Sequence, residues 1–170
     1  MYDASALPIE ENIKKTKTFV EKKGKDLLIE GACDEIVDAT GAQRCEITDA
    51  DKCEHYMKET GVDVVVANLG TEHRASGKTL HYYQDAAQAI CAKVGPKICL
   101  HGTSSVSNDQ IKNLFKDGIC KVNIWTALER DSSPLLAEFM VKNIEKVAGD
   151  RMTEKLISEG YLTDKRNTGD

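Results

Sequence analysis

The chain has 170 residues, a length that suits one domain with a substantial hydrophobic core. Hydrophobic residues make up 41% of it and charged residues 30%, as in ordinary soluble globular proteins. The net charge of −5 argues against nucleic acid as the main partner. No apolar stretch approaches the roughly 20 residues of a membrane span, and the first residues do not resemble a signal peptide. We therefore expect a cytoplasmic protein without a membrane partner.

The first part of the chain alternates between helical and strand-like segments. Residues 8–24 have the apolar spacing of a solvent-facing amphipathic helix, and residues 26–32 follow as a short apolar strand. Residues 48–61 predict a second helix, with Thr48 or Asp49 as its N-cap and a glycine as its stop. Next comes VDVVVANLG, where a continuous run of β-branched residues is typical of a strand buried on both faces.

The alternation continues to the C-terminus. The later predicted strands are 96–102 and 119–126, and the later predicted helices are 78–95, 107–118, 133–149 and 150–160. Ser107 or Asn108 would cap the helix at 107–118, and Pro134 would lie near the first turn of its helix, where the missing N–H costs least. The last ten residues are polar and are expected to fray.

Six cysteines are spread along the chain, and none forms a C-x-x-C pair. Cys99 and Cys120 lie inside apolar runs. This pattern favours reduced, mostly buried thiols over a disulfide framework or a sulfur-ligated zinc ion.

Alternating strands and helices predict a parallel sheet with helical crossovers. Two architectures compete, an open doubly wound sheet and part of a TIM (β/α)8 barrel. No G-x-G-x-x-G follows any strand, which weakens the dinucleotide-binding form of the open sheet. A complete barrel needs roughly 200 residues or more, so this chain supplies about half of one.

Polar residues stand at the carboxyl ends of the predicted strands, where parallel α/β folds bind their ligands. In chain order they are Glu30, His73, His101 and Asn123, and Asp3 precedes the first helix. Imidazole and carboxylate groups suit zinc. Two histidines at the ends of successive strands, each beside a glycine, favour a metal site over structural histidines.

The residues after His101 are small and carry hydroxyl groups. In such a loop, Gly102, Thr103, Ser104 and Ser105 can bring backbone N–H groups and hydroxyls close to an anion, and a helix N-terminus adds positive potential. Barrels often bind phosphate with the loops after strands 7 and 8, and the loop at 102–105 and the pair Trp125–Thr126 fit those two places.

Three strings, TGVDVVVANLGTEH, KICLHGTSS and DGICKVNIWT, together resemble the C-terminal half of class II (zinc-dependent) fructose-bisphosphate and related ketose-bisphosphate aldolases. MYDAS…ENI and LLIEGA resemble the family's fourth and fifth strands, so the likeness covers residues 1 to about 147. It implies a TIM barrel, with residues 1–149 as its C-terminal half and residues 150–170 as a helical extension with a polar tail.

The resemblance also implies roles for single residues. By this likeness His73 and His101 are zinc ligands, Glu30 is a metal-site glutamate, Asp3 is an active-site aspartate, and Asn123 contacts the bound triose. The implied activity is zinc-dependent aldol cleavage and condensation of a ketose phosphate, as in glycolysis and related carbohydrate metabolism. The implied assembly is a homo-oligomer, a dimer or larger.

The family keeps its proton-transferring carboxylate on a loop after the fifth strand, and here that loop offers Glu35 and Asp38 with no basis for choosing. For the substrate phosphate, Thr126 and the hydroxyl loop at 102–105 are joined by Arg74, whose guanidinium matches phosphate oxygens. We expect Arg74 to replace backbone contacts that glycine usually provides at its position in the family.

Three departures from the family pattern stand out. The family's other zinc histidine, in an Asp-His pair on an earlier strand, has no counterpart in this sequence. Arg74 stands where the family usually has glycine, and Trp125 where it usually has aspartate. The alternative function is therefore a non-catalytic fragment or assembly partner that retains a phosphate-binding half-barrel.

Overall fold

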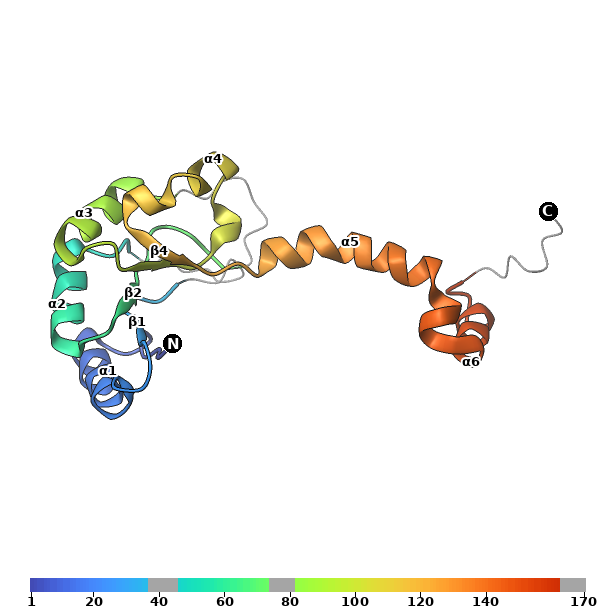
Figure 1. The fold of residues 1–170 in the computed structure, drawn as a ribbon, viewed down its shortest axis with the longest axis horizontal. Helices are drawn as coiled ribbons and strands as arrows, with labels where there is room; N and C mark the ends of the chain where they lie inside the picture. Colours follow the sequence, from blue (N-terminus) through green and yellow to red (C-terminus); the bar gives the residue numbers. More distant parts are fainter. Residues whose placement is uncertain (37–45, 74–81, 163–170) are drawn as a thin grey trace. The chain divides into compact units, whose positions relative to one another are not determined.

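The structure is a computed structural model that describes residues 1–36, 46–73 and 82–162 (Figure 1). The chain divides into two compact units, Met1–Ala127 and Leu128–Asp170. The boundary expected at residue 149 remains a prediction. No helix among the described residues has the length and apolar character needed to cross a bilayer.

The first unit contains one four-stranded sheet, in which every strand runs parallel to its neighbour in the order β1-β2-β3-β4. The strands are β1 (Glu30–Ala32), β2 (Val64–Val66), β3 (Ile98–Leu100) and β4 (Ile119–Val122). Each lies inside a predicted strand, so the predicted α/β class with a parallel sheet is confirmed. The strands are shorter than predicted because parallel ladder pairing covers only three or four residues of each apolar run.

Four helices connect or precede these strands: α1 (Ile9–Lys23), α2 (Ala50–Thr60), α3 (Gln84–Val94) and α4 (Asn108–Ile111). The limits of α2 follow the predicted caps. The Asp49 carboxylate accepts hydrogen bonds from the N–H groups of Asp51 and Lys52, and Gly61 ends the helix with φ 72°. Of the region predicted as helix at 78–95, residues 78–81 lie outside the described residues.

The helix predicted at 107–118 is interrupted. Ser107 caps α4 in a capping box with Gln110, as predicted, but a separate 3-10 turn follows at Leu114–Asp117. The carboxylate of Asp117 explains the second turn, since it is buried and accepts hydrogen bonds from Tyr82, Gln84 and Gln88. These contacts bind the turn to the start of α3 and outweigh a continuous helix.

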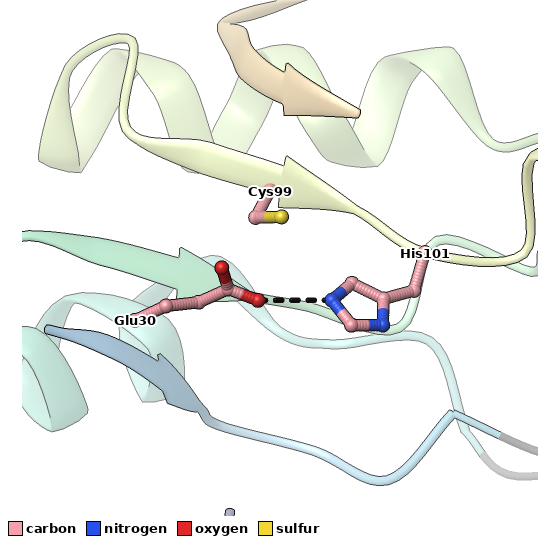
Figure 2. Close-up of side chains that lie close together, drawn as sticks. All are labelled: Glu30, Cys99 and His101. Carbon is pink, nitrogen blue, oxygen red and sulfur yellow. Dashed lines mark hydrogen bonds and ion pairs between the residues drawn. The ribbon is translucent and has the colours of Figure 1, made fainter. Parts of the chain in front are cut away.

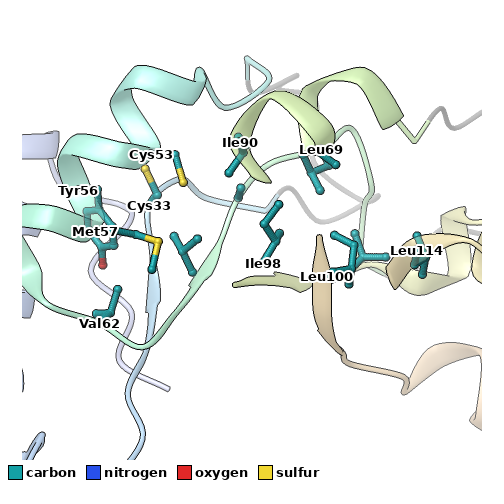
Figure 3. Close-up of a cluster of buried hydrophobic side chains, with 14 of the residues drawn as sticks. Cys33, Cys53, Tyr56, Met57, Val62, Leu69, Ile90, Ile98, Leu100 and Leu114 are labelled. Atoms are coloured by element: carbon teal, nitrogen blue, oxygen red, sulfur yellow. The ribbon is translucent and has the colours of Figure 1, made fainter. Parts of the chain in front are cut away.

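The main hydrophobic core lies between the sheet and α1, α2 and α3 (Figure 3). Side chains alternate across the sheet, so Val65, Ile98 and Leu100 face this core, where they meet residues such as Tyr56 and Ile90 from the helices. The opposite face of the sheet carries a small second cluster made of Ala32, Val66 and Cys99. Glu30 and His101 share the strand parity of this second face, which positions them away from the main core.

The five described cysteines are all free thiols, which agrees with the expectation of reduced cysteines. Cys33, Cys53 and Cys99 are buried. The expectation that Cys120 is buried was wrong, because the register between β3 and β4 shifts next to it and its side chain is exposed.

The second unit holds most of α5 (Thr126–Lys142) and all of α6 (Ile144–Ser158). The prediction that Pro134 lies in a first turn was wrong, because α5 already begins at Thr126 and encloses the proline. The predicted helix end at Gly149 is partly confirmed, since this residue has φ 71° and interrupts the helical geometry inside α6.

Candidate functional site

A buried carboxylate and a buried imidazole lie side by side on the face of the sheet opposite the main core (Figure 2). Glu30 begins β1 and His101 directly follows β3, and both residues are less than a tenth exposed. Glu30 Oε1 lies 2.9 Å from His101 Nε2. The first and third strands of the sheet therefore bring these polar groups into contact across β2, although Glu30 stands at the start of β1 and not at its carboxyl end as predicted.

The ring nitrogen Nε2 of His101 has two possible partners, and the ring proton decides between them. When Nε2 carries the proton it donates to Glu30, because an ionised carboxylate can only accept. When Nδ1 carries the proton, Nε2 accepts instead from the amide Nδ2 of Asn123, also 2.9 Å away. In this second state Oε1 and Nε2 are both acceptors, and the lone pair of Nε2 is directed at the amide of Asn123.

Lys121 on β4 completes this cluster. Its Nζ lies 2.5 Å from Glu30 Oε2 and donates to Asn123 Oδ1 at 2.9 Å, which fixes the orientation of the amide toward His101. Burial by itself would raise the pKa of Glu30, but the hydrogen bonds from Lys121 and His101 outweigh it and lower that pKa. Glu30 is therefore ionised at neutral pH and serves as the negative centre of the cluster.

The thiol of Cys99 lies on the same face, two residues before His101. Ligand atoms of Glu30, Cys99 and His101 all lie within 4.8 Å of one another, and all three residues are buried (Figure 2). Burial, with the nearby charge of Glu30, raises the pKa of the Cys99 thiol to about 12. The free thiol is thus neutral at physiological pH.

This donor set fits a divalent metal ion of the zinc type. Carboxylate oxygen, imidazole nitrogen and thiolate sulfur are the three ligand kinds that zinc takes in proteins. Bonds of about 2.0–2.1 Å in a tetrahedral site place neighbouring ligand atoms roughly 3.3 Å apart, close to the spacing of Oε1 and Nε2. The spacing of these two atoms therefore fits one bound ion, provided that the present hydrogen bonds of Glu30 and His101 rearrange.

His73 lies beside His101, with ring centroids 5.5 Å apart and ring planes at 80°. Two cavities meet at this pair of histidines. One has a volume of about 540 Å³ and includes Asp3 and Glu35 in its lining. The structure thus brings both predicted zinc ligands next to two of the predicted acidic residues.

The second cavity has a volume of about 460 Å³ and is lined by predicted phosphate-binding residues and by the triose-contacting residue, namely Gly102, Thr103, Ser104, Asn123 and Thr126. Trp125 lines it as well. The two predicted phosphate segments, from the loops after β3 and β4, therefore share one cavity with the histidines. Its lining is the expected place for an anionic part of a substrate.

The hydroxyl loop itself is shaped by contacts within the protein. Gly102 has φ 69°, and a Cβ there would lie 2.8 Å from the backbone N and O of Glu72. Thr103 Oγ1 donates to the carbonyl of Asn123, and Ser105 Oγ accepts from the N–H of Glu72 at 3.0 Å. The residues after His101 are small because the backbone there passes directly against the loop that holds His73.

The expected help from a helix N-terminus is weaker than predicted. The hydroxyl loop forms a 3-10 turn at Thr103–Ser105, and α4 after it has only four residues. A short helix has a small macrodipole, so the cavity depends on individual N–H and O–H groups.

Two of the predicted acidic residues have distinct surroundings. Asp3 is exposed, and its Oδ1 accepts from the N–H and hydroxyl of Ser5, so it closes a local turn. Asp3 does not cap α1, because Pro8 is the N-cap of this helix and no side chain makes a cap hydrogen bond there. Glu35 is exposed at the rim of the larger cavity.

Two predicted residues, Asp38 and Arg74, lie outside the described residues. Two other members of the cluster were missed in the sequence. Cys99 and Lys121 each stand two positions before a predicted site residue, His101 and Asn123, on the same strand. Because side chains alternate across a strand, counting back by two from a site residue would have found both.

A family model described as fructose-bisphosphate aldolase class-II matches residues 1–162. The 6-phospho-5-dehydro-2-deoxy-D-gluconate aldolase of Shouchella clausii is 32% identical over 130 residues, 74% of this chain and 44% of that protein. The fructose-bisphosphate aldolase of Ureaplasma parvum is 31% identical over 165 residues, 91% of this chain and 53% of that protein. This chain spans about half the length of the curated relatives it matches.

Solved structures of similar fold are aldolases too. The YdjI aldolase of Escherichia coli K12 has a TM-score of 0.66 at 24% identity, over 92% of this chain and 57% of that one. The fructose-bisphosphate aldolase of Campylobacter jejuni has a TM-score of 0.64 at 19% identity, over 85% of this chain and 45% of that one. The fold likeness and the family match agree, and the chain belongs to the class II fructose-bisphosphate aldolase family.

Proposed function

We propose that this chain carries out zinc-dependent aldol cleavage and condensation of a ketose (bis)phosphate such as fructose 1,6-bisphosphate, giving dihydroxyacetone phosphate and an aldehyde. The observation that carries the proposal is the buried Glu30–His101 pair beside His73, in a chain of the class II aldolase family. The position of His73 and His101 in the lining of two cavities supports it. The (β/α)8 half-barrel is the architecture we propose for the sheet and its helices.

Glu30, His73 and His101 would hold the ion, and Cys99 is close enough to Glu30 and His101 to join them. When bound, zinc would act as a Lewis acid that polarises the ketose carbonyl.

The remaining residues would bind and orient the substrate. Asn123 can donate from Nδ2 into the smaller cavity in the tautomer where His101 does not need it, so we assign it the contact with the triose. Ser104 and Thr126 line the same cavity, and with Gly102, Thr103, Ser105 and Arg74 they are our phosphate-binding set.

A carboxylate must move the proton during cleavage. Glu35 is our first choice of the two candidates, because its exposed side chain lines the larger cavity together with both histidines. Asp38 remains the alternative on the same loop. Glu35→Gln should abolish proton transfer while substrate binding remains, if the choice is right.

The relatives favour a phosphorylated substrate. The names of the two relatives, a 6-phospho-5-dehydro-2-deoxy-D-gluconate aldolase and a fructose-bisphosphate aldolase, both contain a phosphorylated sugar derivative. The hydroxyl-lined cavity next to the histidines supports the same substrate class here.

The test is an assay of aldol cleavage by the full chain. It measures the dihydroxyacetone phosphate released from fructose 1,6-bisphosphate. We expect activity that a chelator removes and added zinc restores, and that His101→Ala abolishes. His55→Ala is the matched control, because His55 is an exposed histidine on α2 near Glu10. Activity that persists in His101→Ala would contradict the proposal.

The second candidate is a non-catalytic, phosphate-binding half-barrel that acts as an assembly partner. The cavity lined by Gly102, Thr103, Ser104 and Thr126 supports it, because it could hold phosphate without any metal chemistry. It predicts substrate binding in equilibrium dialysis with no cleavage at any zinc concentration, and this combination distinguishes it from the aldolase.

A further inference from the structure

The ammonium group of Lys121 already acts as a cation inside the cluster. Its Nζ lies 2.5 Å from Glu30 Oε2, 2.9 Å from Asn123 Oδ1 and 3.7 Å from Cys99 Sγ. Glu30 and Cys99 are also two of the three residues whose ligand atoms lie within 4.8 Å of one another. The lysine thus bonds to atoms that a metal ion would need.

Lys121 and Glu30 come from strands that are not neighbours in the sheet. Lys121 lies on β4 and Glu30 on β1, which are the outermost strands of the four-stranded sheet. Their side chains nevertheless meet. Both project from the face of the sheet opposite the main core, and the lysine is long enough to reach past Cys99 on β3. The contact is a tertiary one across the sheet rather than a neighbour pair.

One carboxylate, that of Glu30, is both the partner of Lys121 and the proposed metal ligand. Among the described residues, Glu30 is the acidic side chain that contacts both Lys121 and His101, and it is buried. A divalent ion bonded to Glu30 would stand close to the ammonium group, and like charges at that distance repel. The side chain of Lys121 is 48% exposed, so it has a direction in which to leave.

We propose that Lys121 is a built-in competitor for the metal, so that loading of a divalent ion on Glu30 and His101 requires the ammonium group to leave the carboxylate. This inference rests on the metal site of the proposed function. The apparent metal affinity is then the intrinsic affinity reduced by the fraction of molecules in which Lys121 has left. Release of the metal is correspondingly assisted by the return of Lys121.

The most direct experiment measures the zinc affinity of the full chain by competition with a chelator at neutral pH. Lys121→Met keeps the apolar stem and removes the competing charge, and we expect zinc to bind about five- to tenfold more tightly, the scale of one partly exposed ion pair. Lys121→Arg keeps a charge and should remain near the wild type. Lys116→Met is the control for loss of a surface charge, because Lys116 is exposed, donates to Asn113 Oδ1 and lies over the ring of Phe115, away from Glu30.

A second measurement avoids variants that fold poorly. Amine acylation of the wild-type chain, read by mass spectrometry, should show Lys121 becoming more reactive when zinc is added. Lys116 should keep the same reactivity with and without zinc. Unchanged reactivity of Lys121 in the zinc-loaded chain would overturn the inference whatever Lys121→Met does.

The outcomes separate this inference from the proposed function. If zinc binding depends on Glu30 and His101 but Lys121→Met binds equally or more weakly, Lys121 positions Glu30 and the competition is wrong, while the metal site stands. If Glu30→Gln and His101→Ala bind zinc as well as the wild type, the metal site of the proposed function is itself wrong.

Discussion

At the scale of single residues, the site depends on a charge held in a buried place. Glu30 remains ionised because Lys121 and His101 supply hydrogen bonds that burial has made necessary. The same arrangement stabilises the fold and holds the carboxylate that we propose as a metal ligand. A substitution of Glu30 should therefore change both the stability of the fold and the proposed metal binding.

We expect Glu30→Gln to lower the free energy of unfolding by about 1–2 kcal/mol at pH 7, because Lys121 loses a charged partner that is only partly screened by solvent. Hydrogen bonds from Lys121 and His101 hold the pKa of Glu30 in the folded protein below its usual value of 4.5. Its contribution is thus complete above that pH and is lost as the pH falls through the folded pKa. Urea unfolding of both proteins should show their difference shrinking below about pH 4.5.

Glu21→Gln is the control, since Glu21 is exposed on α1 and should show neither the loss nor its pH dependence. A constant difference between Glu30→Gln and the wild type down to strongly acidic pH would contradict a depressed pKa at Glu30.

At the scale of elements, the ends of helices and the turns after strands set the positions of the site residues. Gly61 and Gly102 have nearly the same left-handed backbone conformation, with φ 72° and 69°. Only Gly102 lies against the backbone of another loop, that of Glu72. The two glycines therefore form a natural pair for separating backbone strain from close approach.

Gly61→Ala should cost about 1–2 kcal/mol of unfolding free energy, the cost of a left-handed alanine. Gly102→Ala should cost clearly more, because the new Cβ meets the backbone of Glu72 at 2.8 Å. Thermal unfolding of both variants checks this order. Equal losses would mean that the loop after His101 moves aside freely.

The N-cap of α2 offers a test of how this helix begins. Asp49→Ala should cost about 1 kcal/mol, because two N–H groups of the first turn lose their acceptor. Asp49→Asn keeps a capping oxygen and should retain most of the stability. Chemical denaturation of the two variants would contradict the cap if both behaved alike.

The sequence was sufficient for the elements whose signals are local. The caps at Asp49, Gly61 and Ser107 were readable because the capping side chain or glycine stands beside the helix it ends. The start of α5 was not, since Pro134 marks a local first turn that the helix from Thr126 overrides. Of the site, the strand-end residues were predicted, but Lys121 was missed because its partner Glu30 is 91 residues away.

At the scale of the whole molecule, the sheet of the first unit ends in two edge strands. β1 has a bridge to Tyr2 on its outer side, whereas no strand of the described residues pairs with the outer side of β4. Exposed apolar side chains stand near that edge, at Val122, Ile124 and Trp125. Unpaired edges and apolar surface of this kind promote association.

We therefore expect the 170-residue chain to self-associate or aggregate, as a half-barrel with open edges should. Sedimentation velocity across a range of protein concentrations measures this directly. Ile124→Asp should shift the chain toward the monomer, and Phe115→Asp, on the exposed 3-10 turn, should not. A monodisperse monomer with sharp cooperative unfolding would argue against the half-barrel.

The central claim is that Glu30 and His101 form a metal site in a member of the class II aldolase family. Elemental analysis of the purified full chain tests it most directly, on the wild type and on His101→Ala, with His55→Ala alongside. We predict about one zinc per chain in the wild type and in His55→Ala, and loss of most of that zinc in His101→Ala. Equal zinc content in His101→Ala and the wild type would contradict the claim.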